Sequence, residues 1–392
     1  MKGKISSRAR DVPPSGIRKF FELVIGVEDV ISLGVGEPDF VTPWHIREAC
    51  IYSLEKGYTM YTSNYGLLEL REALSGALGR DYDLGYDPKG ELLVTVGVSE
   101  AFDLAVRATI DQGDEVIVPE PSYVAYKPCI TFAGGRPLPL PTRREEGFKV
   151  IPEELEEMIT PRTKALVLSY PNNPTGAVMG RKDLEGVAEV VEEHDLLVIS
   201  DEVYDKLTYS GRHIPFASLD GMRDRTILLN GFSKAYAMTG LRIGYAAGNR
   251  EIIEAMMKIH QYTMLCAPIT GQVAALEALR HGEREMREMV RQYDQRRRFM
   301  VKRLNEIGLR CFEPKGAFYT FPSIEGTGMT SGEFAKALLE EEKVAVVPGD
   351  AFGASGEGFV RCAYAASMAD IREAMRRIER FVRRHAKGQK YK

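Results

Sequence analysis

A lysine with the surroundings of a reactive amine lies in the segment of residues 231–244, which reads GFSKAYAMTGLRIG. Lys234 stands there among small and apolar residues, and a second cation, Arg242, follows eight residues later. A lysine in apolar surroundings loses its charge more easily than one in water, and its neutral amine can attack a carbonyl carbon. Lys234 is therefore our candidate for an amine that forms an imine with a carbonyl compound.

A second motif, GVSE at residues 97–100, has the features of an anion site. Gly97 allows a tight turn, and we expect Ser99 to cap the helix that begins there. The first amide groups of a helix have no partner within it and can bind a phosphate. An ordinary helix cap would give the same pattern, so this motif alone leaves both interpretations open.

Two further polar motifs follow apolar runs of strand type. NPTG at residues 173–176 gives a rigid turn that contains an amide side chain. SDEVY at residues 200–204 puts an acid, Asp201, at the end of a predicted strand and a phenol, Tyr204, three residues later. The acid could pair with a ring nitrogen and the other two groups could donate to a ring oxygen. Taken singly, NPTG could be turn chemistry and Asp201 could be a helix cap.

Strand-like and helix-like segments alternate between about residues 65 and 250, and this order predicts how the motifs meet. The strand-like runs are residues 92–96, 115–118, 165–169, 196–200, 226–229 and 243–247, and the helix-like stretches are residues 67–78, 99–110 and 182–194. Such alternation is typical of an α/β fold with a mostly parallel sheet covered by helices on both faces. Ligands bind beyond the carboxyl ends of parallel strands, where all four motifs lie.

The chain changes character after about residue 250, where the helices lengthen. Strand-like runs at residues 317–322, 344–347 and 358–364 and a helix-like stretch at 334–341 precede a final helix. The final helix carries one apolar stripe, formed by Ile371, Met375, Ile378, Phe381 and Val382. A chain of 392 residues exceeds one ordinary hydrophobic core, so we expect a second, smaller α+β domain here.

Composition excludes several classes of protein. With 52 Lys and Arg against 56 Asp and Glu, the net charge is -4, which offers no overall positive field for nucleic acid or anionic lipid. No apolar run is long enough for a membrane span. The five cysteines and the histidines, including His194, His213 and His260, show no metal-ligand spacing. We therefore expect a cytoplasmic enzyme without a metal site, a membrane anchor or a nucleic-acid partner.

The residues and the order of five motifs resemble those of the fold-type-I enzymes that depend on pyridoxal 5'-phosphate (PLP), and specifically those of the class I aminotransferases. The motifs are SLGVGEPDF at 32–40, NPTG at 173–176, SDEVY at 200–204, the lysine segment at 231–244 and VRCAYA at 360–365. The resemblance spans nearly the whole chain. It implies a large domain with a mostly parallel seven-stranded sheet and a smaller α+β domain.

The same resemblance implies boundaries, partners and an activity. An N-terminal segment, 1–45, would join a small domain at 285–392, and the PLP-binding domain would occupy 46–284. The chain would act as a homodimer. It would transfer the amino group of an L-amino acid, with aspartate or an aromatic amino acid favoured, to a 2-oxo acid such as 2-oxoglutarate in a ping-pong reaction.

The resemblance also implies roles for individual residues. Lys234 would hold PLP as a Schiff base and then move the substrate proton, and Asp201 would pair with the pyridine nitrogen. Asn173 and Tyr204 would bind the ring oxygen, and Tyr123 would stack on the ring. The phosphate would be bound by Val98, Ser99, Glu100, Ser233, Arg242 and, from the partner subunit, Tyr61.

The substrate carboxylate has its own implied partners. Arg361 would grip it through two parallel hydrogen bonds, which a lysine cannot copy, and Gly36 and Asn173 would complete the grip. Arg18 and the segment 315–319 (KGAFY) are the places where substrate choice could be set. A cation suits a dicarboxylate, and Phe318 and Tyr319 suit an aromatic side chain, although each could equally be packing or surface.

Alternatives from other classes fit less well. A dinucleotide-binding dehydrogenase needs three spaced glycines before a helix, whereas Gly34 and Gly36 are followed by Glu-Pro-Asp. A transcription regulator built on the same fold would need an added DNA-binding segment, and the 32–40 motif begins too early to leave room for one. Lyases and decarboxylases that use PLP share the same lysine, acid and phosphate cup, so they remain open.

Overall fold

The computed structural model describes residues 2–18 and 24–385 and centres on a seven-stranded sheet. The strand order is β2-β8-β7-β6-β5-β3-β4, and only β8 runs antiparallel to its neighbours. The strands are β2 (Leu92–Thr95), β3 (Glu115–Glu120), β4 (Arg136–Pro141), β5 (Thr163–Ser169), β6 (Leu197–Asp201), β7 (Thr226–Gly231) and β8 (Gly244–Ala247). The predicted α/β fold with a mostly parallel sheet is thus confirmed.

One strand of this sheet was not predicted. β4 has the sequence RPLPLP, in which prolines alternate with other residues. Proline cannot donate to a neighbouring strand, so it is confined to sheet edges and bulges. β4 pairs only with β3 and forms an edge of the sheet, which is where such a strand can exist.

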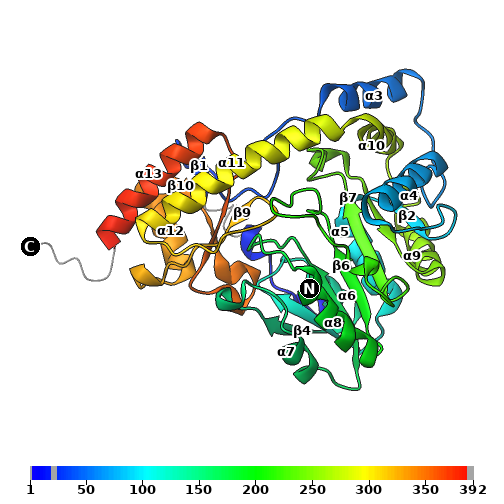
Figure 1. The fold of residues 1–392 in the computed structure, drawn as a ribbon, viewed down its shortest axis with the longest axis horizontal. Coiled ribbons are helices and arrows are strands. Elements are labelled where there is room, and N and C mark those ends of the chain that lie inside the picture. The colour runs from blue at the N-terminus through cyan, green and yellow to red at the C-terminus, as the bar shows by residue number, and fades with distance from the viewer. Residues whose placement is uncertain (1, 19–23, 386–392) are drawn as a thin grey trace, which may run out of the picture.

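Helices cover both faces of the sheet because neighbouring strand residues point to opposite sides. On β7, Ile227 and Leu229 join the core under α5, α6 and α9, while Leu228 joins the core under α4 and α8. The helices of this part are α3 (Trp44–Glu55), α4 (Leu68–Tyr82), α5 (Gly97–Thr109), α6 (Tyr126–Ala133), α7 (Pro152–Glu157), α8 (Arg181–Glu193), α9 (Arg250–Thr263) and α10 (Ile269–His281). Figure 1 shows this layered body at the right, and the rest of the chain at the left.

The second part of the structure contains two small sheets. β11 (Val347–Pro348), β12 (Val360–Ala363) and β9 (Tyr319–Thr320) form an antiparallel sheet, and β1 (Ile31–Ser32) pairs in parallel with β10 (Val344–Ala345). The helices are α1 (Ser7–Asp11), α11 (Glu283–Ile307), α12 (Ser331–Glu342) and α13 (Met368–His385). The β1–β10 pair joins the N-terminal segment to this part. The predicted domain boundaries at residues 45 and 284 stay a prediction.

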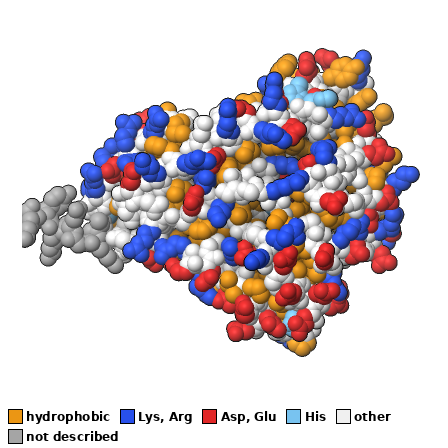
Figure 2. All heavy atoms as spheres, viewed as in Figure 1, with side chains coloured by type: hydrophobic (Ala, Val, Ile, Leu, Met, Phe, Trp, Pro, Cys, Tyr) orange, Lys and Arg blue, Asp and Glu red, His pale blue; other side chains and the backbone are white. Residues whose placement is uncertain are grey.

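The surface carries both signs of charge, in agreement with the nearly balanced composition. On the face seen in Figure 2, basic side chains are frequent over α11 and α13, whereas acidic ones gather at the lower edge, over α7 and α8. Within the described ranges, no helix is both long and apolar enough to cross a membrane.

The apolar stripe predicted for the last helix is confirmed, because its five members are all buried. We expect Phe381→Ala to lower the free energy of unfolding by about 3–5 kcal/mol, since it removes a buried ring and leaves a cavity. The Phe381 ring is fully buried and packs edge-on against Phe334, with 5.2 Å between the ring centroids. Thermal denaturation should show a lower midpoint for Phe381→Ala and no comparable change for Arg376→Ala, whose side chain is 67% exposed on the same helix. Equal midpoints would contradict the assignment of α13 to this core.

Candidate active site

A cavity of about 780 Å³ lies at the carboxyl ends of the central strands. Its lining includes eleven of the residues to which the family resemblance assigns a cofactor or substrate-carboxylate role, namely Gly36, Val98, Ser99, Tyr123, Asn173, Asp201, Tyr204, Ser233, Lys234, Arg242 and Arg361. They come from segments that are far apart in the chain and that meet because parallel strands end at one edge of the sheet. The structure therefore brings four motifs and the distant arginine into one site.

Lys234 follows the end of β7 and points its amine into this cavity. The Lys234 Nζ atom donates a hydrogen bond to the carbonyl oxygen of Gly36, with 2.8 Å between them. Burial lowers the pKa of Lys234 to about 8; the Glu37 carboxylate opposes this shift, whereas the Arg361 and Arg242 guanidiniums add to it. A large fraction of this amine is therefore neutral near pH 8, as a nucleophile requires.

Asp201 is the last residue of β6 and is buried on the cavity wall. Its carboxylate accepts a hydrogen bond from the Tyr126 hydroxyl at 2.7 Å and another from the Val203 amide at 3.2 Å. Burial raises the pKa of Asp201 to about 6 despite these donors. A cationic partner would therefore be well matched to this carboxylate. Sequence reasoning missed Tyr126; its signal was its place three residues after Tyr123.

A pair of tyrosines lies close to Lys234. The hydroxyl oxygens of Tyr204 and Tyr319 are 2.7 Å apart, and both side chains are buried. Burial raises the pKa of Tyr204 well above its ordinary value, so its phenol keeps its proton at neutral pH. Lys234 Nζ lies 5.9 Å from the centroid of the Tyr204 ring. Tyr204 can thus donate to an acceptor close to the lysine amine.

The start of α5 forms a cradle beside Arg242. Gly97 has a φ of +74°, and a Cβ atom there would come within 2.4 Å of Arg242 Nη2. A Cβ atom on Gly244 would lie 2.5 Å from the Gly97 carbonyl carbon, so β8 can approach the turn only because Gly244 has no side chain. The free amides of the first helical turn and the guanidinium form a donor set that suits a phosphate.

The expected cap role of Ser99 is wrong. The helix begins at Gly97 and is preceded by Val96, which makes no side-chain cap bond, so Ser99 lies inside the first turn. The reason is that Gly97 itself makes the turn into the helix, two residues earlier than the serine. Glu100 does not line the cavity. Its carboxylate accepts a hydrogen bond from the Val96 amide and lies 2.8 Å from His260 Nδ1.

Arg361 on β12 reaches the same cavity from the second part of the chain. Its side chain is 2% exposed, and it donates to Asn173 Oδ1 at 2.9 Å and to the Gly34 carbonyl oxygen at 2.7 Å. The Arg361 Nε atom is buried and has no hydrogen-bond partner. A Cβ atom on Gly36 would lie 2.9 Å from the Tyr319 hydroxyl oxygen, which leaves room there only for backbone. These groups can bind an anion such as a carboxylate.

These donors fit PLP, which carries a phosphate, a ring nitrogen, a ring oxygen and an aldehyde. The cradle at Gly97 and Arg242 suits the phosphate, and Asp201 suits a protonated ring nitrogen. Tyr204 suits the ring oxygen, and Lys234 suits the aldehyde. The cavity is also lined by four cations and two acids, Arg18, Lys234, Arg242 and Arg361 against Glu37 and Asp201. This excess of positive charge matches an anionic cofactor and an anionic substrate.

Some predicted residues lie elsewhere. Tyr61 is 81% exposed and does not line the cavity within this chain. Of the residues considered for substrate choice, Arg18 and Tyr319 line the cavity, whereas Lys315 and Phe318 do not.

The histidines without ligand spacing have various partners. His213 meets Glu202 at 2.7 Å and His260 meets Glu100. Tertiary structure also brings His194 near Glu156 and Glu193, with ligand atoms within 4.8 Å of one another. The two glutamates of this last group are exposed, and clusters of exposed acids are common on proteins without a bound ion.

Comparison with known proteins gives close matches over nearly the whole chain. Residues 28–378 match the family model described as aminotransferase class I and II. The chain is 48% identical to an aspartate aminotransferase of Pyrococcus abyssi and 45% identical to aromatic-amino-acid aminotransferase 2 of Thermococcus litoralis, covering 97% of this chain and 98% of each relative. An aromatic aminotransferase structure from Pyrococcus horikoshii superposes with a TM-score of 0.89 at 48% identity, covering 94% of this chain and 99% of that one.

The shifted pKa of Lys234 can be tested on protein stripped of small molecules. Reductive methylation needs the neutral amine, so its rate at Lys234 should rise as the pH increases and reach half of its maximum near pH 8. An unperturbed lysine would reach this point near pH 10.4, about the ordinary value for the side chain. Peptide mass spectrometry at a series of pH values measures the extent at this one lysine. A half-maximum near the ordinary value would contradict the burial argument.

Proposed function

Because the chain belongs to the class I and II aminotransferase family, we propose that it moves the amino group of aspartate or an aromatic L-amino acid to 2-oxoglutarate. Its aminotransferase activity and its dependence on PLP follow from the family. One observation supports the detailed proposal: a partly neutral amine, a buried acid and a buried guanidinium line one cavity, at Lys234, Asp201 and Arg361. The proposed reaction is ping-pong, with donor and acceptor using this cavity in turn.

The residues of the cavity suggest how the cofactor is held. PLP, when bound, supplies an aldehyde that takes up the amino group and a ring that accepts the electrons left at the substrate carbon. We assign Asp201 to the ring nitrogen and Asn173 and Tyr204 to the ring oxygen, with Tyr123 on the ring face. The phosphate is assigned to the backbone amides of Val98, Ser99 and Glu100, the Ser233 hydroxyl and Arg242.

Lys234 has two tasks in this proposal. Its Nζ atom would bond to the aldehyde carbon of the cofactor in the resting enzyme. Once displaced by the substrate amine, the lysine amine would take the proton from the substrate Cα atom and return it to the former aldehyde carbon of the cofactor. Both tasks need a neutral amine, which burial and the neighbouring guanidiniums favour. The Gly36 carbonyl oxygen, 2.8 Å from Nζ, supports the orientation of the amine when it carries a proton.

Arg361 is assigned to the substrate α-carboxylate, with the amide of Gly36 and the side chain of Asn173. The guanidinium is already oriented by Asn173 and by the Gly34 carbonyl oxygen, so little side-chain freedom is lost when a carboxylate binds. Its unpartnered Nε atom gains a partner at that moment. A lysine at this position could not reproduce these contacts because its single ammonium group lacks the planar fork.

Substrate choice is proposed from the two residues that line the cavity beyond this core. Arg18 is suited to the side-chain carboxylate of a dicarboxylic substrate, and the buried Tyr319 ring is suited to an aromatic one. The two relatives are named for the same two kinds of substrate, one as an aspartate and one as an aromatic-amino-acid aminotransferase. A cytoplasmic location stays a prediction from the sequence.

Incubation with one amino acid at a time, without any oxo acid, tests the proposal. We expect aspartate or phenylalanine to yield at most one equivalent of its oxo acid per chain and no ammonia, because the amino group stays with the enzyme. Lys234→Ala should slow this half-reaction by about 10²- to 10⁴-fold, the usual contribution of a general base. Lys336→Ala, at a side chain that is 64% exposed on α12, is the matched control.

Two outcomes would contradict this assignment. Catalytic release of ammonia, beyond one equivalent per chain, would identify a lyase instead. An unchanged rate in Lys234→Ala would exclude that residue as the base.

We also propose a homodimer in which Tyr61 completes the partner's phosphate site. Large apolar side chains are exposed on α3, on the segment after it and on α9, among them Trp44 at 58%, Met60 at 77%, Tyr61 at 81% and Tyr262 at 85%. Exposed apolar patches of this kind mark interaction sites. A second copy of the chain would cover them and bring Tyr61 to a cavity that it does not line in its own chain.

Mixing two impaired variants tests the shared site. Tyr61→Ala and Lys234→Ala should each have low activity, because one damages the site of the partner and the other damages its own. After both are unfolded together and refolded, half of the dimers are mixed and hold one intact site, so activity should recover to about a quarter of wild type. Absence of recovery, with dimers present by light scattering, would show that Tyr61 acts within its own chain.

A further inference from the structure

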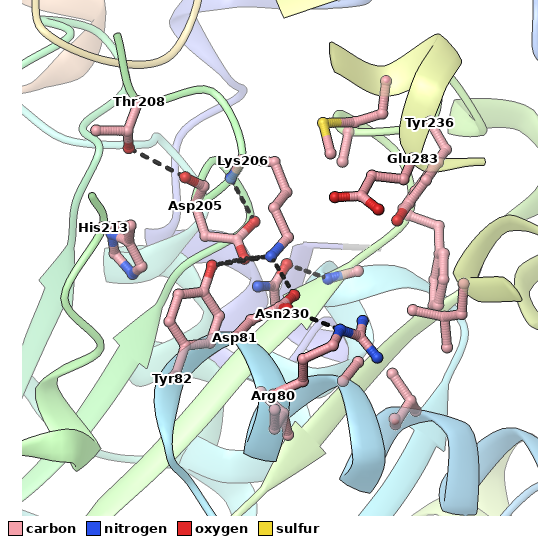
Figure 3. Close-up of a pocket in the computed structure, with 18 of the residues that line it drawn as sticks. Arg80, Asp81, Tyr82, Asp205, Lys206, Thr208, His213, Asn230, Tyr236 and Glu283 are labelled. Carbon is pink, nitrogen blue, oxygen red and sulfur yellow. Dashed lines mark hydrogen bonds and ion pairs between the residues drawn. The ribbon is translucent and has the colours of Figure 1, made fainter. Parts of the chain in front are cut away.

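A second cavity, of about 790 Å³, lies behind the segment that carries Lys234. Its lining comes from α4, the loop after β6, the end of β7 and the α10–α11 junction (Figure 3). Asn230, Phe232 and Tyr236 form part of its wall, and these residues flank the catalytic lysine in sequence. The two cavities share no lining residue, so the second one is separate from the cofactor and substrate site.

The inner wall of this cavity carries polar groups that lack protein partners. The hydroxyls of Tyr236 and Tyr245 have no hydrogen bond to any described residue, although these side chains are only 8% and 7% exposed. Asn230 is 5% exposed, and its Oδ1 atom accepts from the Gly231 amide, which leaves its NH₂ group for the cavity. Burial raises the pKa of both tyrosines, so their phenols stay protonated and can donate. Such groups need a polar ligand or water.

A network around Lys206 fixes one side of the cavity. The Lys206 Nζ atom lies 2.8 Å from Asp81 Oδ2 and donates to the Tyr82 hydroxyl at 3.2 Å. The Tyr82 hydroxyl in turn donates to Asp205 Oδ2 at 2.5 Å. Figure 3 shows these side chains facing Tyr236 and Glu283 across the cavity. The wall is therefore held in place before any ligand binds, which lowers the entropy lost on binding.

Positive charge exceeds negative charge in the lining of the cavity. The lining includes five cations, Arg80, Lys206, Arg212, Arg280 and Arg287, against three acids, Asp81, Asp205 and Glu283. Arg212 donates to the backbone oxygen of Asp81 and forms no ion pair with a described acid. Arg280 and Arg287 meet acids only in exposed pairs, and the exposed Arg80 meets the partly buried Asp81. Exposed pairs contribute little stability, so an incoming anion can replace the acid at small cost.

We propose that this second cavity binds a small, multiply charged anion that carries carboxylate or phosphate groups. The guanidiniums of the lining can form bidentate hydrogen bonds with either group, and the inner hydroxyls and the amide can donate to the remaining oxygens. The volume lies in the range of small-molecule sites, about 300–1,000 Å³. The site does not depend on which substrates the catalytic cavity accepts.

Binding of two probes to the PLP-loaded enzyme tests this proposal. Citrate represents the carboxylate source and inorganic pyrophosphate the phosphate source, and calorimetry measures affinity and stoichiometry. We expect one molecule of probe to bind per PLP-loaded chain. The probe that binds more tightly identifies whether the natural anion carries carboxylate or phosphate groups. Arg287→Glu should weaken this binding by about tenfold or more, since a charge-assisted hydrogen bond is lost. Tyr245→Phe should weaken it by about two- to tenfold through loss of one neutral hydrogen bond.

Arg291→Glu is the matched control for the charge reversal. Arg291 lies one turn further along α11, is 69% exposed like the 74% exposed Arg287, and does not line the cavity. Its replacement should leave the affinity unchanged. The proposal is overturned if neither probe binds, if Arg287→Glu binds as well as wild type, which would place the probe in the catalytic cavity, or if both arginine variants lose affinity equally.

Discussion

The site is organised around one lysine amine that is buried beside two guanidiniums. Arg361 and Arg242 both disfavour a charge on Lys234, and burial disfavours it further, while Glu37 and Asp201 offset part of this cost. The balance brings the pKa of the amine to about 8, so that it can act as nucleophile and base near neutral pH.

The parallel sheet brings the charged groups of this arrangement together. Asp201 ends β6 and Lys234 follows the neighbouring strand β7, and both reach the same edge of the sheet because these strands run in the same direction. The cradle at the start of α5 closes because Gly97 and Gly244 leave space that any side chain would fill. Two buried tyrosines, Tyr126 and Tyr319, hold Asp201 and Tyr204 in place from behind.

The site that we propose for the substrate carboxylate lies where the two parts of the structure meet. Arg361 comes from β12, and its guanidinium donates to Asn173 of the large part and to the backbone of Gly34. The carboxylate-binding group is thereby oriented by the same amide that we assign to the cofactor ring. The second cavity is lined by residues that flank Lys234 in the same segment, so one stretch of backbone contributes to two separate pockets.

The sequence alone determined the alternating strands, the motifs at their ends and the resemblance to an enzyme family, because each of these features depends on a short segment of consecutive residues. Tertiary structure decided what depends on packing between distant segments. It supplied Tyr126 and Tyr319 as supports and the second cavity, and it moved the start of α5 ahead of Ser99. It also paired the proline-rich β4 as an edge strand. Hydrogen bonds and cavities between such segments depend on positions in space, which sequence spacing does not encode.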